Sequence, residues 1–391
     1  MMKFEKLERL PPYVLAIVND LKARARRAGE DVVDLGFGNP NHPTPPHVVE
    51  KLVEAARDPR NHHYSASRGL PNLRRAMARW YERRYAVRLD PETQVMSTIG
   101  AKEGLSHFVI AAIQRGDTVL CPDPCYPIHS FSVLIAGGDI RRVPLLPLDG
   151  LLERLEEATL ASWPRPKMLI ASFPHNPTTA TVDLAYLTRL VDFCRRNELV
   201  LVHDLAYAEI CYDGYVPPSV LQVPGAMDCA IEFTSLSKSH AMAGWRVGFA
   251  AGNAELVRML GRVKSYLDYG TFQPIQIATI IALDGPQDFV AEIVEDYRQR
   301  RNALCEGLEQ ASWKIEKPLG TMFVWAPVPE RFASLGSLEF SKLLLEQAQV
   351  AVAPGVGFGP AGEGFVRFAL VENTHRIRQA VRSMRKLLRD G

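Results

Sequence analysis

Leu199-Val200-Leu201-Val202-His203-Asp204 is an apolar run that ends in a carboxylate. A strand that is apolar on both faces needs a sheet covered on both sides, as parallel sheets in α/β proteins are. An amphipathic helix is expected just before the run, over 184–197. Shorter apolar runs separated by helical patterns lie on either side, so strands alternate with helices. This alternation predicts an α/β fold around a mostly parallel sheet.

The rest of the chain divides into two patterns. Further strands are expected at 95–98, 118–121, 139–143, 167–171, 230–234 and 246–251, with helices at 102–114 and 131–136. From about residue 288 a long helix to 310, strands at 322–326 and 365–369 and a last helix indicate a smaller α+β domain. We therefore expect an N-terminal arm and part of the small domain at 1–45, a large domain at 46–285 and the C-terminal small domain at 286–391.

Composition excludes several classes of protein. The 391 residues include 46 Lys and Arg and 44 Asp and Glu, so no basic surface for nucleic acid is expected. The six cysteines form no Cys-x-x-Cys pair, which predicts free thiols, a reducing compartment and no metal site. No apolar run is long enough to span a bilayer, and the first residues lack the apolar centre of a secretion signal. We expect a cytoplasmic protein with no membrane partner.

Polar residues gather where the expected strands end. In a doubly wound sheet, ligands bind outside the carboxyl ends of the strands. The groups expected at this edge are Gly100, Ala101, Lys102, Asn176, Asp204, Ser235, Ser237 and Lys238. Taken alone, Asp204 could instead cap the following helix, and Asn176 could simply make a turn before Pro177.

These residue types fit one ligand. The helix that Gly100 and Ala101 open offers free amides to a phosphate, and Ser235, Ser237 and Arg246 suit the same dianion. An aspartate at a strand end can pair with a protonated ring nitrogen, and a nearby lysine can form an imine. These are together the requirements of pyridoxal 5′-phosphate.

The segment 235–248 resembles the cofactor-lysine signature of the class I/II aminotransferases of fold type I. The segments 173–178, 203–207, 364–369 and 64–71 resemble four further motifs of that family, in the same order, and the resemblance covers essentially the whole chain. It implies a fold type I pyridoxal-phosphate-dependent transferase, with a mostly parallel large domain and a smaller α+β domain.

The resemblance also implies a role for each matching residue. Lys238 would form the Schiff base and move the proton, Asp204 would hold the pyridine nitrogen, and Asn176 and Tyr207 would bind the ring oxygen. Tyr126 would stack on the ring. The phosphate would be held by Ala101, Lys102, Ser235, Ser237 and Arg246, and by Tyr64 of a neighbouring subunit, which implies a homodimer. Arg367 would bind the substrate carboxylate beside Gly38.

Within the family, segments 10–14, 98–104 and 204–210 resemble the glutamate–pyruvate (alanine) aminotransferase branch, and diaminopimelate aminotransferases share parts of them. Tyr13 and Lys102 are then candidate substrate contacts. Residues 265–297 contain no Arg or Lys, so the second-carboxylate clamp of dicarboxylate-specific relatives is missing, which argues against aspartate. Arg68 is a candidate for holding a glutamate side chain.

The leading hypothesis is a ping-pong transfer of an amino group between an L-amino acid, alanine, and 2-oxoglutarate through Lys238. The alternatives are another amino donor (methionine, aromatic, branched-chain or diaminopimelate), a pyridoxal-phosphate β-lyase, or a cofactor-bound regulatory domain. His62, His63 and His129 are expected to be structural or solvated, and His240 to fill space. The glycines at 355–359 do not have the spacing of a dinucleotide loop and predict a loop near the substrate.

Overall fold

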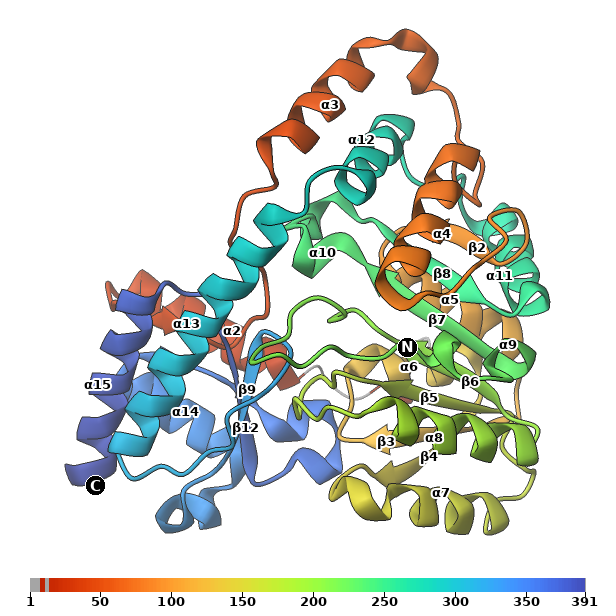
Figure 1. Ribbon diagram of the computed structural model, residues 1–391. Coiled ribbons are helices and arrows are strands. Elements are labelled where there is room, and N and C mark those ends of the chain that lie inside the picture. The colour runs from red at the N-terminus through yellow and green to blue at the C-terminus, as the bar shows by residue number, and fades with distance from the viewer. Residues whose placement is uncertain (1–7, 11–13, 391) are drawn as a thin grey trace, which may run out of the picture.

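A seven-stranded sheet forms the centre of the larger part of the chain in the computed structural model, which describes residues 8–10 and 14–390 (Figure 1). The strand order is β2-β8-β7-β6-β5-β3-β4. The pairs from β4 to β7 are parallel, whereas β8 is antiparallel to both of its neighbours. The strands are β2 (Val95–Thr98), β3 (Thr118–Asp123), β4 (Asp139–Pro144), β5 (Met168–Ser172), β6 (Val200–Asp204), β7 (Ala230–Ser235) and β8 (Gly248–Gly252). The prediction of an α/β fold around a mostly parallel sheet is confirmed.

Helices cover both faces of this sheet. Leu201 of β6 packs in a core with α4 (Pro71–Tyr85), α7 (Leu151–Leu160) and α8 (Leu184–Arg196). Its neighbour Val202 packs in a separate core with α5 (Ala101–Ala112), α6 (Pro127–Ala136) and α11 (Ala254–Leu267). Because successive strand residues point to opposite faces, the unbroken apolar run of β6 fills both cores.

The C-terminal part of the chain is built around a smaller antiparallel sheet with strand order β11-β12-β9. Its strands are β9 (Phe323–Pro327), β11 (Ala353–Pro354) and β12 (Phe365–Ala369), and its helices are α13 (Asp288–Gln310), α14 (Gly336–Ala348) and α15 (Thr374–Asp390). The sequence correctly predicted two of these strands and the long first helix. The short strand β11 was not foreseen.

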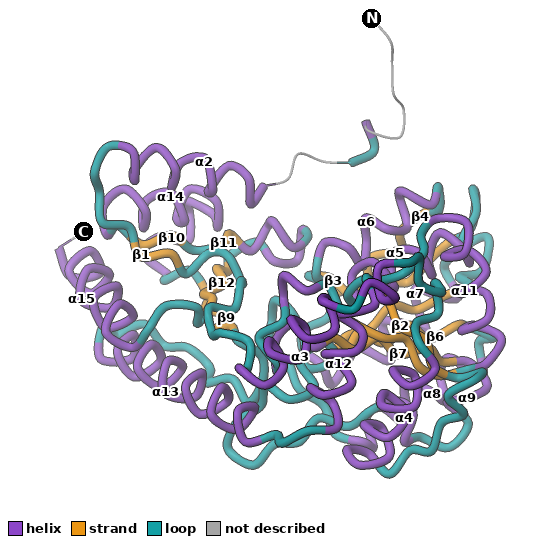
Figure 2. The backbone as a smooth tube through the Cα atoms, turned by 90° about the horizontal axis from the view of Figure 1, so that it is seen from above, coloured by secondary structure: helices purple, strands orange, loops and turns teal. Residues whose placement is uncertain are grey.

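The N-terminal segment lies against this C-terminal part (Figure 2). Strand β1 (Val33–Asp34) pairs in parallel with β10 (Val350–Ala351). Leu21 and Ala25 of α2 (Val14–Arg27) pack against Leu345 of α14. The chain then crosses to the larger part through α3 (Pro46–Arg57), which contacts α12 (Gln273–Asp284).

Two elements begin more than one residue away from the start that the sequence predicted. The strand expected at 246–251 begins only at Gly248, because Arg246 has a φ of 57°, which no strand residue adopts. The helix expected from residue 131 begins at Pro127, since proline fits the first turn of a helix, where its missing N–H is not needed. The short helices α9 (Ala226–Cys229) and α10 (Leu236–Ser239) flank β7. No helix in the described part of the chain is long and apolar enough to cross a membrane.

Candidate active site

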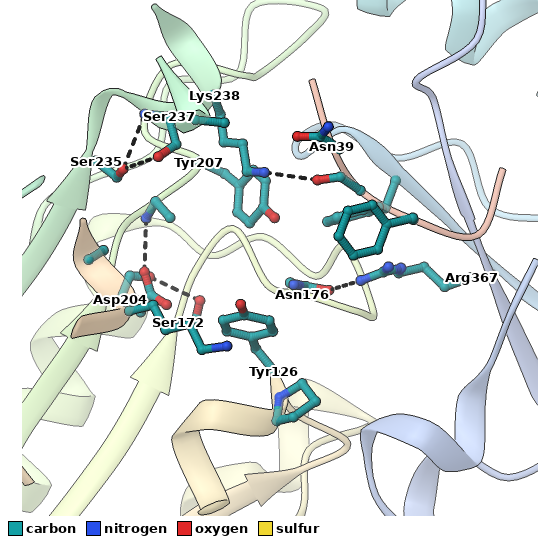
Figure 3. A pocket seen from close by; sticks show the side chains of 18 of the residues that line it. Asn39, Tyr126, Ser172, Asn176, Asp204, Tyr207, Ser235, Ser237, Lys238 and Arg367 are labelled. Atoms are coloured by element: carbon teal, nitrogen blue, oxygen red, sulfur yellow. Dashed lines mark hydrogen bonds between the residues drawn. The ribbon is translucent and has the colours of Figure 1, made fainter. Parts of the chain in front are cut away.

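A cavity of about 370 Å³ lies at the edge where the parallel strands end (Figure 3). Its walls come from these strand ends, from the N-terminal segment and from the small sheet. Most of the residues predicted from the sequence line it: Gly38, Ala101, Lys102, Tyr126, Asn176, Asp204, Tyr207, Ser235, Ser237, Lys238, Arg246 and Arg367. Ser172, Ala206 and Phe323 also line the cavity and were not predicted, and Phe358 lines it from the segment 355–359, which was expected near the substrate.

Tyr64 and Arg68 do not line this cavity. Tyr64 is 84% exposed, and its ring lies against Tyr269 with 4.6 Å between centroids. Tyr13 lies outside the described residues. The guanidinium of Arg68, the candidate for a glutamate side chain, donates to the Glu92 carbonyl.

Lys238 enters the cavity from α10, directly after β7 (Figure 3). Its Nζ donates to the Gly38 carbonyl at 3.0 Å, and among the described residues it forms no ion pair with a carboxylate. Burial, with Arg367 and Arg246 nearby, lowers the pKa of Lys238 from 10.5 to about 8. The amine therefore loses its proton far more readily than an ordinary lysine, as a nucleophile or base must.

Asp204 is the last residue of β6 and is buried. One carboxylate oxygen lies 2.9 Å from Nε2 of the buried His129, and the other accepts the Ala206 N–H at 3.1 Å. Ser172 Oγ donates to the Asp204 carbonyl at 2.9 Å. The contact of His129 was not foreseen, although its position three residues after Tyr126 on the first turn of α6 puts both on one helix face.

The opposite side of the cavity is an anion-binding cup. Helix α5 begins at Ala101, and a Cβ at Gly248 would lie 2.6 Å from the Ala101 nitrogen, so only glycine lets β8 approach this helix end. Ser235 Oγ lies 2.8 Å from Ser237 Oγ and accepts the Ser237 N–H at 3.1 Å. Arg246 is exposed, and its guanidinium donates to the Ile99 carbonyl at 3.4 Å. Hydroxyls, a helix N-terminus and a guanidinium together suit a phosphate.

Arg367 of β12 approaches from the small sheet. It is 5% exposed, and its guanidinium lies 4.0 Å above the Phe323 ring and 4.5 Å from that of Phe358. Nη1 donates to Asn176 Oδ1 at 2.7 Å and Nη2 to the Gly36 carbonyl at 3.2 Å. A planar guanidinium held in this way can present its edge to a carboxylate.

Two tyrosines stand between the cup and Arg367 (Figure 3). Tyr207 follows β6 and packs edge-on against Phe323 with 5.6 Å between centroids, and burial raises the pKa of its phenol. Tyr126 precedes α6 and makes an edge contact with His129 at 5.7 Å. The cavity thus combines an anion cup, a buried carboxylate, two rings, an amine and an arginine.

The family described as aminotransferase class I and II matches residues 30–384 of the chain. The chain belongs to this family. The aminotransferase is 52% identical over 390 residues to glutamate-pyruvate aminotransferase AlaC of Escherichia coli (strain K12), covering 100% of this chain and 95% of the relative. It is 42% identical to the LL-diaminopimelate aminotransferase of Moorella thermoacetica, covering 99% of each.

Solved structures agree with this assignment. A single mutant of Thermus thermophilus aspartate aminotransferase superposes with a TM-score of 0.91 at 29% identity, covering 99% of this chain and 100% of the other. The aminotransferase has fold type I, as predicted, and its cofactor is pyridoxal 5′-phosphate.

The residues of the cavity fit this cofactor. Gly100 has a φ of 80°, and a Cβ there would lie 2.6 Å from Arg246 Nη2, so a side chain would displace the guanidinium from the cup. The Asp204 carboxylate is buried on the far side, where it can hold a protonated ring nitrogen. Lys238 offers an amine of lowered pKa between the cup and Arg367. Each group of the cofactor therefore has a complementary group in the cavity.

Proposed function

We propose that this aminotransferase transfers the amino group of L-alanine to 2-oxoglutarate by a ping-pong mechanism. One observation carries the proposal: Lys238, with its lowered pKa, and the buried Arg367 line the same cavity of about 370 Å³. Likeness to a glutamate-pyruvate aminotransferase over the whole chain supports alanine as donor.

The cofactor, when bound, supplies an aldehyde that takes up the amino group and a ring that accepts the electrons released at the substrate α-carbon. Lys238 would hold the cofactor through its amine, and the same amine would act as the base that takes the proton from the substrate α-carbon. Asp204 keeps the ring nitrogen protonated, and His129 holds Asp204 in place. Asn176 and the Tyr207 hydroxyl bind the ring oxygen, and Tyr126 covers the ring face.

The remaining residues bind the charged ends of cofactor and substrate. Arg367 would hold the substrate α-carboxylate through two of its N–H groups, and the absence of a side chain at Gly38 lets Phe323 pack beside it. The phosphate is held by the cup residues Ala101, Lys102, Ser235, Ser237 and Arg246. Ionic contacts at both ends orient the reacting α-carbon over the Lys238 amine.

The enzyme acts as a homodimer in this proposal. Aromatic side chains that are costly to expose gather beside one another: Tyr64 is 84%, Tyr269 61% and Phe272 46% exposed. A second copy of the chain covers them, and Tyr64 of each copy reaches the phosphate of the other. Without this contact the cup lacks one of its expected donors.

Two further expectations belong to the same proposal. The chain divides into an N-terminal arm at 1–45, a large domain at 46–285 and a small domain at 286–391, supported by α3 starting at Pro46 and α13 at Asp288. The protein is cytoplasmic, in keeping with six cysteines that are all free thiols in the structure.

A second candidate donor is LL-diaminopimelate, because a relative with that activity is 42% identical over nearly the whole chain. The test records the visible absorbance of the holoenzyme during successive additions. We expect L-alanine to remove the band of the Lys238-bound cofactor and 2-oxoglutarate to restore it. If LL-diaminopimelate alone removes the band, the second candidate replaces the first. If a cysteine S-conjugate is split into its thiol, pyruvate and ammonia without a keto-acid acceptor, the enzyme is a β-lyase instead.

A further inference from the structure

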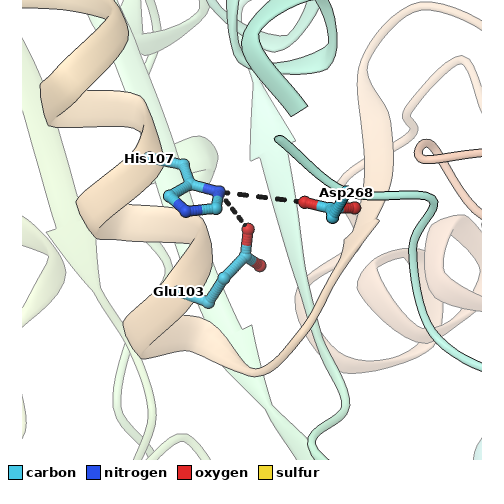
Figure 4. Close-up of side chains that lie close together, drawn as sticks. All are labelled: Glu103, His107 and Asp268. Atoms are coloured by element: carbon cyan, nitrogen blue, oxygen red, sulfur yellow. Dashed lines mark ion pairs between the residues drawn. The ribbon is translucent and has the colours of Figure 1, made fainter. Parts of the chain in front are cut away.

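Glu103, His107, Lys264 and Asp268 form a cluster of charged or polar side chains, and none of them lines the cavity. Figure 4 shows three of them, Glu103, His107 and Asp268. Glu103 and His107 belong to α5, Lys264 to α11, and Asp268 caps the C-terminus of α11. Lys264 Nζ lies 2.7 Å from Glu103 Oε1 and 2.9 Å from Asp268 Oδ2. His107 Nδ1 lies 2.5 Å from the same Glu103 oxygen.

The positive charge in this cluster is the Lys264 ammonium. The ligand atoms of Glu103, His107 and Asp268 lie within 4.8 Å of one another, as they would around a metal ion. The Lys264 side chain is fully buried, however, and its ammonium already bonds both carboxylates. A divalent cation there would face a buried ammonium at contact distance. The cluster is therefore an internal ion network.

Glu103 connects this network to the cup. Its other oxygen, Oε2, accepts the Ile99 N–H at 2.6 Å, while the Ile99 carbonyl accepts from Arg246 Nη2. Ile99 directly precedes Gly100 and Ala101, whose amides open α5. Although burial acts to raise it, the pKa of Glu103 lies below its usual value, because the carboxylate lies beside His107 and accepts from Lys264 and the Ile99 amide. The strand-to-helix turn is thus held by an ionised acceptor.

Asp268 connects the same network to the segment that carries Tyr64. Asp268 Oδ1 accepts the Gly270 N–H at 2.6 Å, and the Asp268 carbonyl accepts from Ser67 Oγ at 2.6 Å. Tyr269, between them in the chain, is the residue that packs on Tyr64. Lys264 therefore donates to Glu103, which accepts from the turn of the cup, and to Asp268, which accepts from the segment beside Tyr64.

We propose that Glu103, held by Lys264 and His107, is a positioning residue for the phosphate cup, and that Asp268 extends this control to Tyr64. The inference rests on the proposed function, since it assumes that the cup binds the cofactor phosphate. Glu103 touches neither cofactor nor substrate. It fixes the direction of the amides at Gly100 and Ala101, and so acts on the phosphate alone.

The test compares pyridoxal 5′-phosphate with pyridoxal, which lacks the phosphate. Apoenzyme is titrated with each compound, and dissociation constants are measured for wild type and Glu103→Gln. A neutral amide is a weaker acceptor than a carboxylate, so we expect the affinity for the phosphate form to fall roughly tenfold. The affinity for pyridoxal should stay within about twofold of wild type. General loosening of the fold would weaken both compounds equally.

Asp117→Asn is the matched control. Asp117 is also buried, accepts an N–H from Gln114 at 3.0 Å and pairs with Lys167 at 2.8 Å, but it precedes β3 at the opposite edge of the sheet. It should leave the ratio of the two affinities unchanged. Lys264→Met should lower the ratio of the affinity for pyridoxal 5′-phosphate to that for pyridoxal, as Glu103→Gln does. If Glu103→Gln does not fold, Lys264→Met provides the test in its place.

The two proposals fail differently. If wild type binds neither compound, the proposed function falls and the positioning role with it. If wild type prefers the phosphate form but both variants lose the two compounds equally, or lose neither, the positioning role alone is overturned.

Discussion

His129 Nε2 lies 2.9 Å from Asp204 Oδ2, and both side chains are buried beneath the cavity. An ionised carboxylate only accepts hydrogen bonds, so His129 carries its hydrogen on Nε2 and donates it. The imidazole thereby fixes the rotamer of Asp204. An orienting group behind the carboxylate is needed if Asp204 is to hold a protonated ring nitrogen.

Replacing His129 tests this relationship. His129→Phe leaves one oxygen of a buried carboxylate without a donor, which costs about 1–3 kcal/mol. We expect kcat at saturating cofactor to fall roughly 10- to 100-fold. His129→Gln keeps an N–H donor and should lose clearly less. Equal kcat values for the two variants would show that the imidazole only fills space.

The lowered pKa of Lys238 predicts a cost in stability for the apoenzyme. At pH 7 the folded protein must hold a buried ammonium whose pKa is about 8 instead of 10.5. Lys238→Met should therefore stabilise the apoenzyme by roughly 1–3 kcal/mol at pH 7, while abolishing transamination. Unfolding in urea, followed by circular dichroism, measures the difference.

The sign of the pH dependence follows from the same shift. Below pH 8 both folded and unfolded wild type carry the proton, and the full cost is present. Between about pH 8 and 10.5 the folded protein loses the proton first, so wild type gains stability relative to Lys238→Met. A stability difference that stays constant across this window would contradict the shift.

Arg367 provides the third prediction. Arg367→Lys keeps the charge but cannot bond Asn176 and a carboxylate with a planar fork. We expect kcat/KM to fall by about 10- to 100-fold for the amino acid and the keto acid alike, mainly through KM. Arg376→Lys, whose guanidinium pairs with the exposed Asp31, should leave both values unchanged. A loss confined to one substrate would argue against a shared α-carboxylate site.

The packing around Gly38 leads to the fourth prediction. A Cβ at this position would lie 2.7 Å from Cε1 of Phe323, which is 1% exposed and cannot move aside. Gly38→Ala must shift the carbonyl that accepts from Lys238, so we expect a loss of about 1–3 kcal/mol in stability and at least about tenfold in kcat/KM. Gly261 lies within α11, and a Cβ there would be 3.6 Å from the nearest atom, so Gly261→Ala should leave the stability unchanged or raise it. If Gly38→Ala turned over at the wild-type rate, residue 38 would not be closely packed against Phe323.

Much of the site could be predicted from the sequence, because its polar residues stand where the periodic pattern of a strand ends. Asp204 follows an apolar run where β6 stops, and Ser235 is the last residue of β7. A polar residue at the end of a buried strand has few purposes other than capping or ligand binding. Both residues could therefore be singled out from the amino-acid sequence alone.

The rest depended on contacts that no local pattern encodes. His129 and Asp204 lie 75 positions apart, and Arg367 reaches Asn176 only because the C-terminal part docks at the strand ends. The direction of β8 was equally hidden, since an apolar run such as Gly248–Gly252 reads the same in a parallel or an antiparallel strand.

That reversed strand has a practical consequence for redesigning the enzyme. Ser235, the last residue of β7, pairs with Gly248, the first residue of β8. The segment between them carries both Lys238 and Arg246, and it starts and ends at the same edge of the sheet. The pairing of Ser235 with Gly248 fixes both ends of the segment 236–247. An inserted or deleted residue in this segment would change the position of the Lys238 amine relative to the Arg246 guanidinium. Libraries that aim at new amino donors should hold the length of 236–247 constant and place their diversity on the opposite wall, at Phe323 and Phe358.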